Sequence, residues 1–167
     1  MSFPGIPSLD AAVMAFIQTH FHNTVTDTVF PIITSLGEAG IGWIVLSLVL
    51  LCFKKTRRTG GLVLIAMTVT LLFGELTLKN IICRLRPCNV FTDFPMLIAR
   101  PTSYSFPSGH TSSSFAAALI LTLRHKKVGW LAYIPAVLIA FSRIFLFVHY
   151  PTDVLAGILL GLSLIHI

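Results

Sequence analysis

The chain has 167 residues, of which 55% are hydrophobic and only 11% are charged, and its mean hydropathy is +0.88. A soluble domain carries about 25% charged residues, so this composition excludes an ordinary soluble domain and favours a polytopic membrane protein. The net charge of +6 would suggest a nucleic-acid partner in a soluble protein. Here, however, the basic residues gather between apolar runs, which is how membrane topology is encoded, and we expect no nucleic-acid partner.

Seven helical stretches are predicted in chain order, and the first two could form a single span. The stretches run over residues 8–23, 24–36, 41–53, 61–78, 109–123, 128–147 and 151–167. They predict an all-α bundle of about six transmembrane helices, with residues 1–167 forming one membrane-embedded domain. Ser8 or Asp10 is expected to cap the first helix, and Pro135 could kink the sixth. The seventh ends without a polar flank, which suggests that the natural chain is longer.

A loop separates the fourth and fifth stretches, over residues 88–106, and carries an apolar patch at 94–98. An apolar run in a loop this near the membrane is expected to dip into it. The three cysteines, Cys52, Cys83 and Cys88, form neither a disulfide framework nor a metal-ligand spacing. Pairing of Cys83 with Cys88 is left open, and no metal or other cofactor is expected.

The basic residues divide between two sides of the predicted bundle. Clusters at 54–58 and 124–127 hold seven of the 12 Lys and Arg residues. Two predicted spans separate these clusters, so they lie on the same side, which the positive-inside rule places in the cytoplasm. The rule disfavours the remaining basic residues at the opposite, extracytoplasmic face, and a bound anion would explain them there. These are Lys79, Arg84, Arg86, Arg100 and Arg143.

The first candidate element lies at the end of the stretch 61–78. Lys79 and Arg86 are seven positions apart and would share one face of a continuing helix, which Pro87 is expected to stop. Glu75 precedes Lys79 by four residues and is expected to pair with it rather than to act in catalysis. The alternative for this element is an ordinary basic flank at a membrane interface.

The second element, Pro107-Ser108-Gly109-His110, opens the stretch at 109–123. Gly109 lets the backbone approach a ligand closely, and the amino terminus of a helix offers unpaired N–H groups and a positive dipole to an anion. Ser108 adds a hydroxyl, and His110 lies in the first turn, where it can give a proton. Alone, the tetrapeptide could be no more than a capped helix start.

The third element is a run of apolar residues at 142–153 that contains Arg143, His149 and Asp153. A charge buried in a bilayer is costly, so such residues usually line a site or pair with one another. Pro151 favours the start of a new helix, which puts Asp153 in its first turn and His149 at the corner before it. A carboxylate beside a histidine fixes its tautomer and raises its nucleophilicity. The alternative is a helix-capping aspartate next to an interfacial histidine.

All three elements fall at one membrane face in this topology, and together they suit a phosphate group, with one histidine as nucleophile and the other as acid. They resemble the three-part signature of the type 2 phosphatidic acid phosphatase family of integral membrane lipid phosphatases. The resemblance covers about residues 60–160, in the right order and without departures at signature positions. The matching residues are Lys79 followed after six residues by Arg86-Pro87, then Pro107-Ser108-Gly109-His110, then Ser142-Arg143 followed by His149 and Asp153.

The resemblance implies a role for each signature residue. His149 would attack phosphorus and form a phosphohistidine, Asp153 would orient and polarise His149, and His110 would protonate the leaving oxygen. No metal would be needed, because side chains supply the cations. The phosphoryl oxygens would be held by Lys79, Arg86, Arg143, Ser108 and the amide of Gly109.

The expected activity is hydrolysis of a lipid phosphate or diphosphate in a bacterial plasma membrane, with an extracytoplasmic site. Undecaprenyl diphosphate ranks first by analogy, followed by phosphatidylglycerol phosphate and phosphatidic acid. The competing hypothesis is a non-catalytic protein that binds an anionic lipid, or a transporter; the intact histidines and aspartate argue against mere binding, since a cradle needs no nucleophile. Soluble vanadium haloperoxidases carry the same signature, but a chain this short and apolar fits them poorly.

Overall fold

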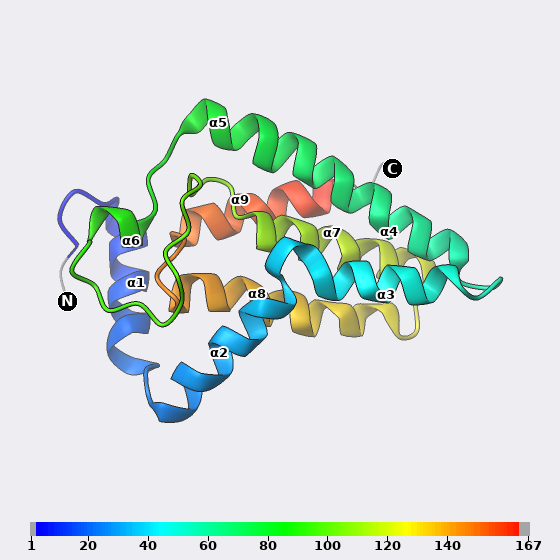
Figure 1. Ribbon diagram of the computed structural model, residues 1–167, viewed down its shortest axis with the longest axis horizontal. Coiled ribbons are helices and arrows are strands. Elements are labelled where there is room, and N and C mark those ends of the chain that lie inside the picture. Colours follow the sequence, from blue (N-terminus) through cyan, green and yellow to red (C-terminus); the bar gives the residue numbers. More distant parts are fainter. Residues whose placement is uncertain (1–2, 164–167) are drawn as a thin grey trace.

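The computed structural model describes residues 3–163, and within that range every regular element is a helix, as predicted (Figure 1). In chain order the elements are α1 (Ser8–His20), α2 (Thr24–Leu36), η1 (Glu38–Gly40), α3 (Ile41–Leu51), α4 (Arg57–Thr70), η2 (Leu71–Leu78), α5 (Lys79–Ile82), α6 (Pro87–Val90), α7 (Gly109–Arg124), η3 (Gly129–Ala132), α8 (Tyr133–Phe145) and α9 (Pro151–Leu162). The segments η1 and η3 are 3₁₀ helices, and η2 is a π-helical segment that joins α4 to α5. The last part of the predicted seventh stretch, residues 164–167, lies outside the described residues.

The helices differ in their ability to cross a bilayer. The stretch Arg57–Val90 has 34 residues and is long and apolar enough to span. The pair Thr24–Leu36 and Glu38–Leu51 is bent by 46° and gives a second span if it counts as one. Gly129–Phe145 and Pro151–Leu162 are apolar but shorter. Within the described residues the predicted number of about six transmembrane helices is therefore not confirmed.

Helix α7 forms the centre of the bundle and packs against α4, α8 and α9. Gly157 and Gly161 of α9 face it: a Cβ at these positions would lie 2.7 Å from the carbonyl oxygen of Ser108 and 2.6 Å from that of Ser112, respectively. Small residues spaced by four allow such close helix crossings. The crossing brings the two helix starts together, and the Ser108 amide donates a hydrogen bond to the Asp153 carbonyl at 3.1 Å.

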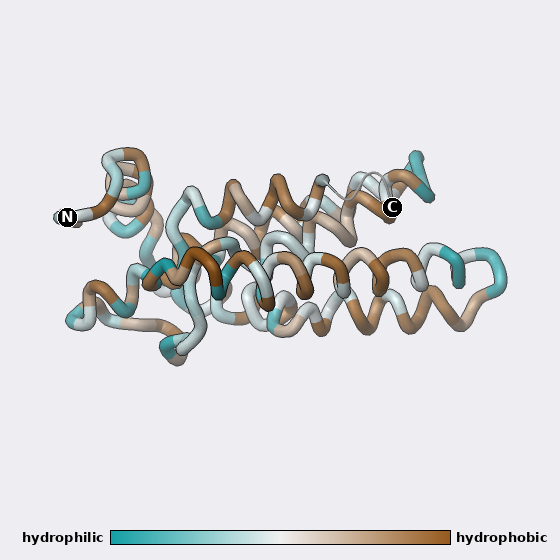
Figure 2. The backbone as a smooth tube through the Cα atoms, turned by 90° about the horizontal axis from the view of Figure 1, so that it is seen from above, coloured by the Kyte–Doolittle hydropathy of each residue, from teal (hydrophilic) through white to brown (hydrophobic). Residues whose placement is uncertain are grey.

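The outer surface of the bundle is apolar. Large side chains point outward from α3, α4, η2 and α9, among them Leu48, Ile65, Phe73 and Leu159, the last of which is 70% exposed. Figure 2 shows hydrophobic residues recurring along the long helices and hydrophilic ones gathering at the turns. Exposed apolar surface of this extent marks contact with a membrane or a partner.

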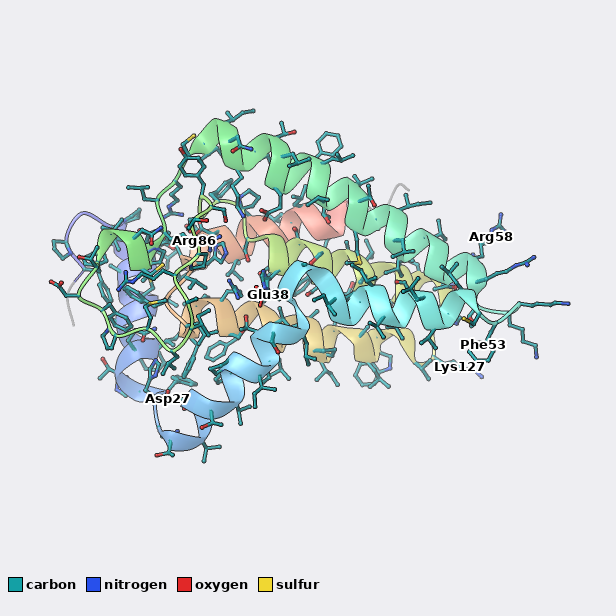
Figure 3. The ribbon with its side chains drawn as sticks, viewed as in Figure 1. Asp27, Glu38, Phe53, Arg58, Arg86 and Lys127 are labelled. Atoms are coloured by element: carbon teal, nitrogen blue, oxygen red, sulfur yellow. The ribbon has the colours of Figure 1, made fainter. Side chains whose placement is uncertain are left out.

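The two basic clusters lie at the same end of the bundle, as predicted. Figure 3 shows Arg58 and Lys127 projecting from the end where α3, α4 and α7 have their turns. Arg86 lies toward the opposite end, among the loops that precede α6 and α7. The two groups of basic residues inferred from the sequence thus lie toward opposite ends of the molecule.

The segment between Lys79 and Arg86 differs from the prediction. The helix ends at Ile82, because Cys83 adopts a left-handed backbone conformation with φ of 51°. Arg86 is extended, with ψ of 151°, as expected for a residue before proline. Lys79 and Arg86 therefore do not share a face of one continuing helix, and Pro87 begins α6 instead of stopping the preceding helix.

The two amino-terminal helices form as separate elements, one of the two arrangements left open by the sequence, and only the predicted cap of α1 is wrong. Asn23 caps α2 by accepting hydrogen bonds from two first-turn amides at 2.9 and 3.1 Å, which separates α2 from α1. The N-cap of α1 is Pro7. Within the described residues, neither Ser8 nor Asp10 makes a side-chain capping hydrogen bond at the start of this helix. Asp10 is instead turned into the bundle and fully buried.

Two possibilities left open by the sequence concern Pro135 and the cysteines. Pro135 is the third residue of α8, where its missing N–H breaks no helical hydrogen bond, so it does not interrupt the middle of the helix. Cys83 is exposed and Cys88 is buried, and both are free thiols in the described structure, so the disulfide left open by the sequence is not formed.

Candidate active site

A cavity of about 960 Å³ lies between the bend from α2 to α3, the η2 segment and the loop that precedes α7. Ser108 and Asp153 do not line it but are fully buried nearby. Six of the eight residues predicted for the site line the cavity, namely Lys79, Arg86, Gly109, His110, Arg143 and His149. The structure thus brings together residues from helices α5, α7 and α8, from the segment that precedes α6, and from the turn between α8 and α9.

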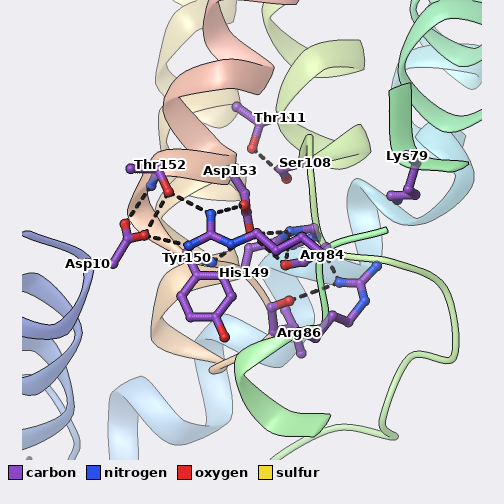
Figure 4. Close-up of polar contacts among 12 residues, drawn as sticks. Asp10, Lys79, Arg84, Arg86, Ser108, Thr111, His149, Tyr150, Thr152 and Asp153 are labelled. Carbon is purple, nitrogen blue, oxygen red and sulfur yellow. Dashed lines mark hydrogen bonds and ion pairs between the residues drawn. The ribbon is translucent and has the colours of Figure 1, made fainter. Parts of the chain in front are cut away.

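His149 lies in the turn between α8 and α9 and is 1% exposed. Its Nε2 atom is 2.9 Å from Nη1 of Arg86. A guanidinium group can only donate hydrogen bonds, so Nε2 must be the acceptor and the ring proton must be on Nδ1. The unprotonated nitrogen therefore points toward Arg86 (Figure 4), and both residues line the cavity.

Arg86 is held in place by other partners before any ligand arrives. Its Nε and Nη2 atoms donate to the carbonyl and hydroxyl oxygens of Ser103 at 2.7 and 2.9 Å, and Nη1 also donates to the Val148 carbonyl at 2.9 Å. The loop before α7 and the turn after α8 thus fix the orientation of the guanidinium. A preoriented guanidinium is the side chain best suited to bind phosphate oxygens.

Asp153 is in the first turn of α9, as predicted, but its contact with His149 is partly indirect. Oδ2 of Asp153 lies 3.5 Å from Nδ1 of His149. Ser105 stands between them: its hydroxyl donates to Asp153 Oδ2 at 2.5 Å and lies 3.4 Å from His149 Nδ1. The Tyr150 amide donates to the same carboxylate oxygen at 2.9 Å. The carboxylate is therefore fixed facing the protonated nitrogen of His149.

Arg143 brings a further cation to the cavity and is 4% exposed. Its Nη1 atom donates to the Thr34 hydroxyl at 2.5 Å. Within the described part of the chain its Nε atom has no hydrogen-bond partner. Since buried donors are normally satisfied, this N–H is available to an oxyanion in the cavity.

Lys79 and Glu75 form the ion pair that the sequence predicted, with Nζ and Oε1 separated by 2.6 Å. Glu75 belongs to the π-helical segment η2, and such segments are frequent at functional sites. A Cβ at Gly109 would collide with the Glu75 carboxylate, which therefore lies at the amino terminus of α7. A carboxylate at a helix amino terminus is favoured by the same dipole that would favour a phosphate.

Ser108 immediately precedes α7. Its hydroxyl oxygen accepts a hydrogen bond from the Thr111 hydroxyl at 2.9 Å (Figure 4), which leaves its own proton to donate. His110 follows in the first turn of α7 and lines the cavity that also contains His149. The two histidines are thus presented to one space, which a nucleophile and a proton donor acting on one phosphoryl group would require.

Burial lowers the pKa of the His149 imidazole well below its ordinary value of 6.5, and the nearby charges of Arg86, Arg143 and Lys79 lower it further. Both effects disfavour the imidazolium form. At neutral pH His149 is therefore uncharged, which is the form in which Nε2 can act as a nucleophile.

Two of the five basic residues that the sequence assigned to this face have other partners. Arg84 forms ion pairs with Asp10 at 2.7 Å and Asp153 at 2.6 Å. Arg100 donates to backbone carbonyls of the 88–106 loop, including that of Thr92 at 2.6 Å. A bound anion is therefore not needed to explain these two residues.

Sequence reasoning missed Ser103 and Ser105, which hold Arg86 and Asp153. Both lie in the irregular loop before α7, where no periodicity marks a buried side chain. Their nearness to the Pro107-Ser108 pair was the one signal that could have pointed to them.

Comparisons with known proteins agree on a family. The model of the PAP2 superfamily matches residues 59–167. An undecaprenyl-diphosphatase from Sulfolobus acidocaldarius is 40% identical over 120 residues, which cover 71% of this chain and 58% of that relative's length. The crystal structure of a transmembrane PAP2 type phosphatidylglycerolphosphate phosphatase from Bacillus subtilis matches with a TM-score of 0.76 and 30% identity, over 98% of this chain and 84% of that chain. Aquifex aeolicus LpxE matches with a TM-score of 0.80 and 25% identity, over 98% of this chain and 95% of that chain.

Proposed function

Because the chain belongs to the PAP2 superfamily, we propose that it hydrolyses the phosphate or diphosphate group of a membrane lipid. The observation that carries this proposal is the buried His149, whose unprotonated Nε2 atom accepts a hydrogen bond from Arg86 in a cavity shared with His110. A site that only bound an anion would gain nothing from a neutral, preoriented imidazole.

In the proposed reaction the phosphoryl group sits against Arg86, Arg143 and Lys79. The phosphoryl oxygens draw the Arg86 N–H away from His149 Nε2, and the lone pair released there attacks phosphorus. The bond from phosphorus to the leaving oxygen breaks, and His110 gives its proton to that oxygen. A water molecule then gives a proton to His110 as it attacks the phosphohistidine. The phosphorus–nitrogen bond breaks, phosphate leaves, and both histidines return to their starting states.

The surroundings of His149 support this sequence of steps. When Nε2 bonds to phosphorus the ring becomes positively charged, and the Asp153 carboxylate, 3.5 Å from Nδ1, stabilises that charge. Ser105 donates to the carboxylate and keeps it from rotating away. The three cations neutralise the equatorial oxygens, which is the task that a metal ion performs in many other phosphoryl-transfer enzymes; we therefore propose metal-independent hydrolysis.

The proposed substrate is an amphiphile. The cavity extends from the phosphate-binding residues to an apolar wall formed by side chains of α2, α3 and α4, including Pro31, Ile44 and Leu64. The apolar loop patch at 94–98 gives this proposal little support. Phe94, Met96 and Ile98 pack against the core, and Phe94 stacks on Phe147 with ring centroids 3.9 Å apart.

Among lipids, undecaprenyl diphosphate remains the first candidate, ahead of phosphatidylglycerol phosphate and phosphatidic acid. The 40% identical relative is an undecaprenyl-diphosphatase, which supports this order, and the Bacillus subtilis structure is that of a phosphatidylglycerolphosphate phosphatase, which supports the second candidate. We propose further that the site opens on the extracytoplasmic face of a bacterial plasma membrane, because the basic clusters lie at the other end of the bundle.

The test is phosphate release by the purified protein in detergent, with the three lipids and glycerol phosphate compared in the presence of EDTA. Hydrolysis of at least one lipid, and a much lower kcat/KM for glycerol phosphate, are expected. The protein should also carry an acid-labile label after brief reaction with a ³²P-labelled substrate. Lipid binding without phosphate release would instead establish the binding or transport alternative, and activity that disappears in EDTA and returns with added metal would refute metal independence.

A further inference from the structure

A largely buried ion network joins Asp153 to residues that do not line the cavity, and it begins at Asp10 of α1. The Asp10 carboxylate is fully buried. Its Oδ1 atom accepts from the Thr152 amide at 2.9 Å, and Oδ2 accepts from the Thr152 hydroxyl and from Nη2 of Arg84, each at 2.7 Å (Figure 4). Asp10 thus caps the first turn of α9 from a different helix.

Arg84 connects this carboxylate to the one beside His149. Its Nη1 atom donates to Oδ1 of Asp153 at 2.6 Å and to the Thr152 hydroxyl at 2.7 Å. Its guanidinium lies over the ring of Tyr150, 3.8 Å from the centroid. A planar fork that bridges two carboxylates and stacks on an aromatic ring has a single orientation, which a lysine could not reproduce.

The two oxygens of the Asp153 carboxylate have different partners, and this difference explains how the network can act on His149. Arg84 holds Oδ1, which leaves Oδ2 turned toward Nδ1 of His149 at 3.5 Å. A guanidinium paired with Asp153 alone would cancel the charge that stabilises the ring. Asp10 shares the guanidinium, so two carboxylates and one guanidinium retain a net charge of −1 beside His149.

We propose that Asp10 and Arg84 are positioning residues for the hydrolysis, which set the orientation and the effective charge of Asp153 and act through it on His149. Neither belongs to the three-part signature, and Asp10 lies before residue 59, where the family match begins. The inference rests on the proposed function and assigns α1 a part in it.

The alternative role is that of a tether which only attaches α1 to the bundle, and Gln18 provides the matched control. It lies on the same helix and is 6% exposed, and its amide donates to the carbonyls of Ile144 and Phe145 at 3.3 and 3.0 Å. It ties α1 to α8 without touching Asp153. Gln18→Leu therefore removes a buried tether of α1 and leaves the ion network in place.

The experiment compares Asp10→Asn, Arg84→Gln, the double variant and Gln18→Leu in purified protein. Asp10→Asn and Arg84→Gln are each expected to lower kcat at least tenfold while KM for the lipid substrate changes less than threefold. The double variant should be no more than threefold slower than Arg84→Gln, because Asp10→Asn keeps an oxygen for the Thr152 amide and loses mainly the pairing with Arg84. Gln18→Leu should lower the melting temperature and keep kcat within threefold of the wild type.

A second readout separates this inference from the proposed function. The ¹⁵N chemical shift of His149 Nδ1 should change in Asp10→Asn and Arg84→Gln but not in Gln18→Leu, whether or not the protein releases phosphate. Wild-type protein without phosphatase activity would refute the proposed function, while the shifts would still decide the inference.

Three results would overturn the inference. They are unchanged shifts, kcat within threefold of the wild type in the two network variants, and an equal loss of kcat in Gln18→Leu. If Asp10→Asn does not fold, Arg84→Lys, which keeps the positive charge but not the fork, provides the same comparison.

Discussion

The two nitrogens of His149 face different surroundings, and this difference underlies the first prediction. Nε2 accepts from Arg86, and Nδ1 faces Asp153 and Ser105. His149→Ala removes the proposed attacking atom and is expected to lower kcat by at least about 10³-fold. Asp153→Asn keeps the shape but loses the charge and favours the wrong tautomer, so a loss of about 10²- to 10⁴-fold is expected. Phosphate release, with circular dichroism to verify folding, measures both.

Exposed His20 on α1 offers a matched control, because its ring nitrogen bonds only to the Phe16 carbonyl in the described structure. His20→Ala should keep kcat close to that of the wild type. Near-normal hydrolysis by His149→Ala would rule out a phosphohistidine formed at this residue.

The second prediction concerns the charge of His149. Its pKa in the folded protein is lowered by burial and by neighbouring cations, whereas in the unfolded chain it is about 6.5. As the pH falls through 6.5 the unfolded chain binds a proton that the folded protein does not, so the contribution of this residue to stability decreases. In the ligand-free protein the imidazole resonance of His149, assigned by comparison with His149→Gln, should not titrate between about pH 7.5 and 5.5. A midpoint near 6.5 would contradict the prediction.

At the scale of elements, the crossing of α7 and α9 aligns Asp153 with the rest of the site. A substitution at Gly157, with Gly61 as its control, tests whether this close crossing matters. A Cβ at Gly157 would lie 2.7 Å from the Ser108 carbonyl oxygen and 3.0 Å from Cβ of Thr111. Gly157→Ala must therefore push α9 away, which is expected to cost about 1–3 kcal/mol of stability and to lower kcat. The free energy of unfolding and the rate of phosphate release provide the measurement.

Gly61 of α4 is the matched control for that substitution. A Cβ there meets no heavy atom within 4 Å in the described residues. Gly61→Ala is expected to raise the stability by about 0.5–1 kcal/mol, because it only reduces the freedom of the unfolded chain and improves helix propensity. Equal effects of the two substitutions would show that the close crossing does not matter.

The elements also show where prediction from the sequence succeeded and where it failed. The spacing of charged residues within apolar runs correctly predicted that His149 and Asp153 lie side by side, because a buried charge needs a partner or a site; their role in catalysis stays a prediction. The path of the chain between Lys79 and Arg86 was not predictable, since neither the π-helical segment nor the left-handed Cys83 has a sequence pattern of its own. Arg84 pairs with a residue 74 positions away, and local spacing cannot indicate such a partner.

For the molecule as a whole, polar side chains share the interior with an apolar core, while large apolar side chains cover much of the outside. Serines, threonines and ion pairs fill parts of the interior, while leucines, isoleucines and phenylalanines cover much of the outside. A lipid environment favours this arrangement, because buried polar groups find partners inside the bundle and apolar side chains face the acyl chains. Many of the buried polar residues line or adjoin the cavity, so that is where the proposed lipid headgroup would bind.

The orientation of the bundle in the membrane gives the last prediction. Seven of the 12 basic residues are in the clusters at 54–58 and 124–127, at the end opposite the cavity-lining Arg86, and the positive-inside rule places that end in the cytoplasm. In a variant without Cys52, Cys83 and Cys88, a single cysteine from Thr92→Cys should react with an impermeant maleimide in intact cells. One from Thr56→Cys should react only after the cells are permeabilised, which also verifies that position 56 is accessible. Labelling of position 56 but not of position 92 in intact cells would place the cavity on the cytoplasmic side and would exclude an extracytoplasmic substrate.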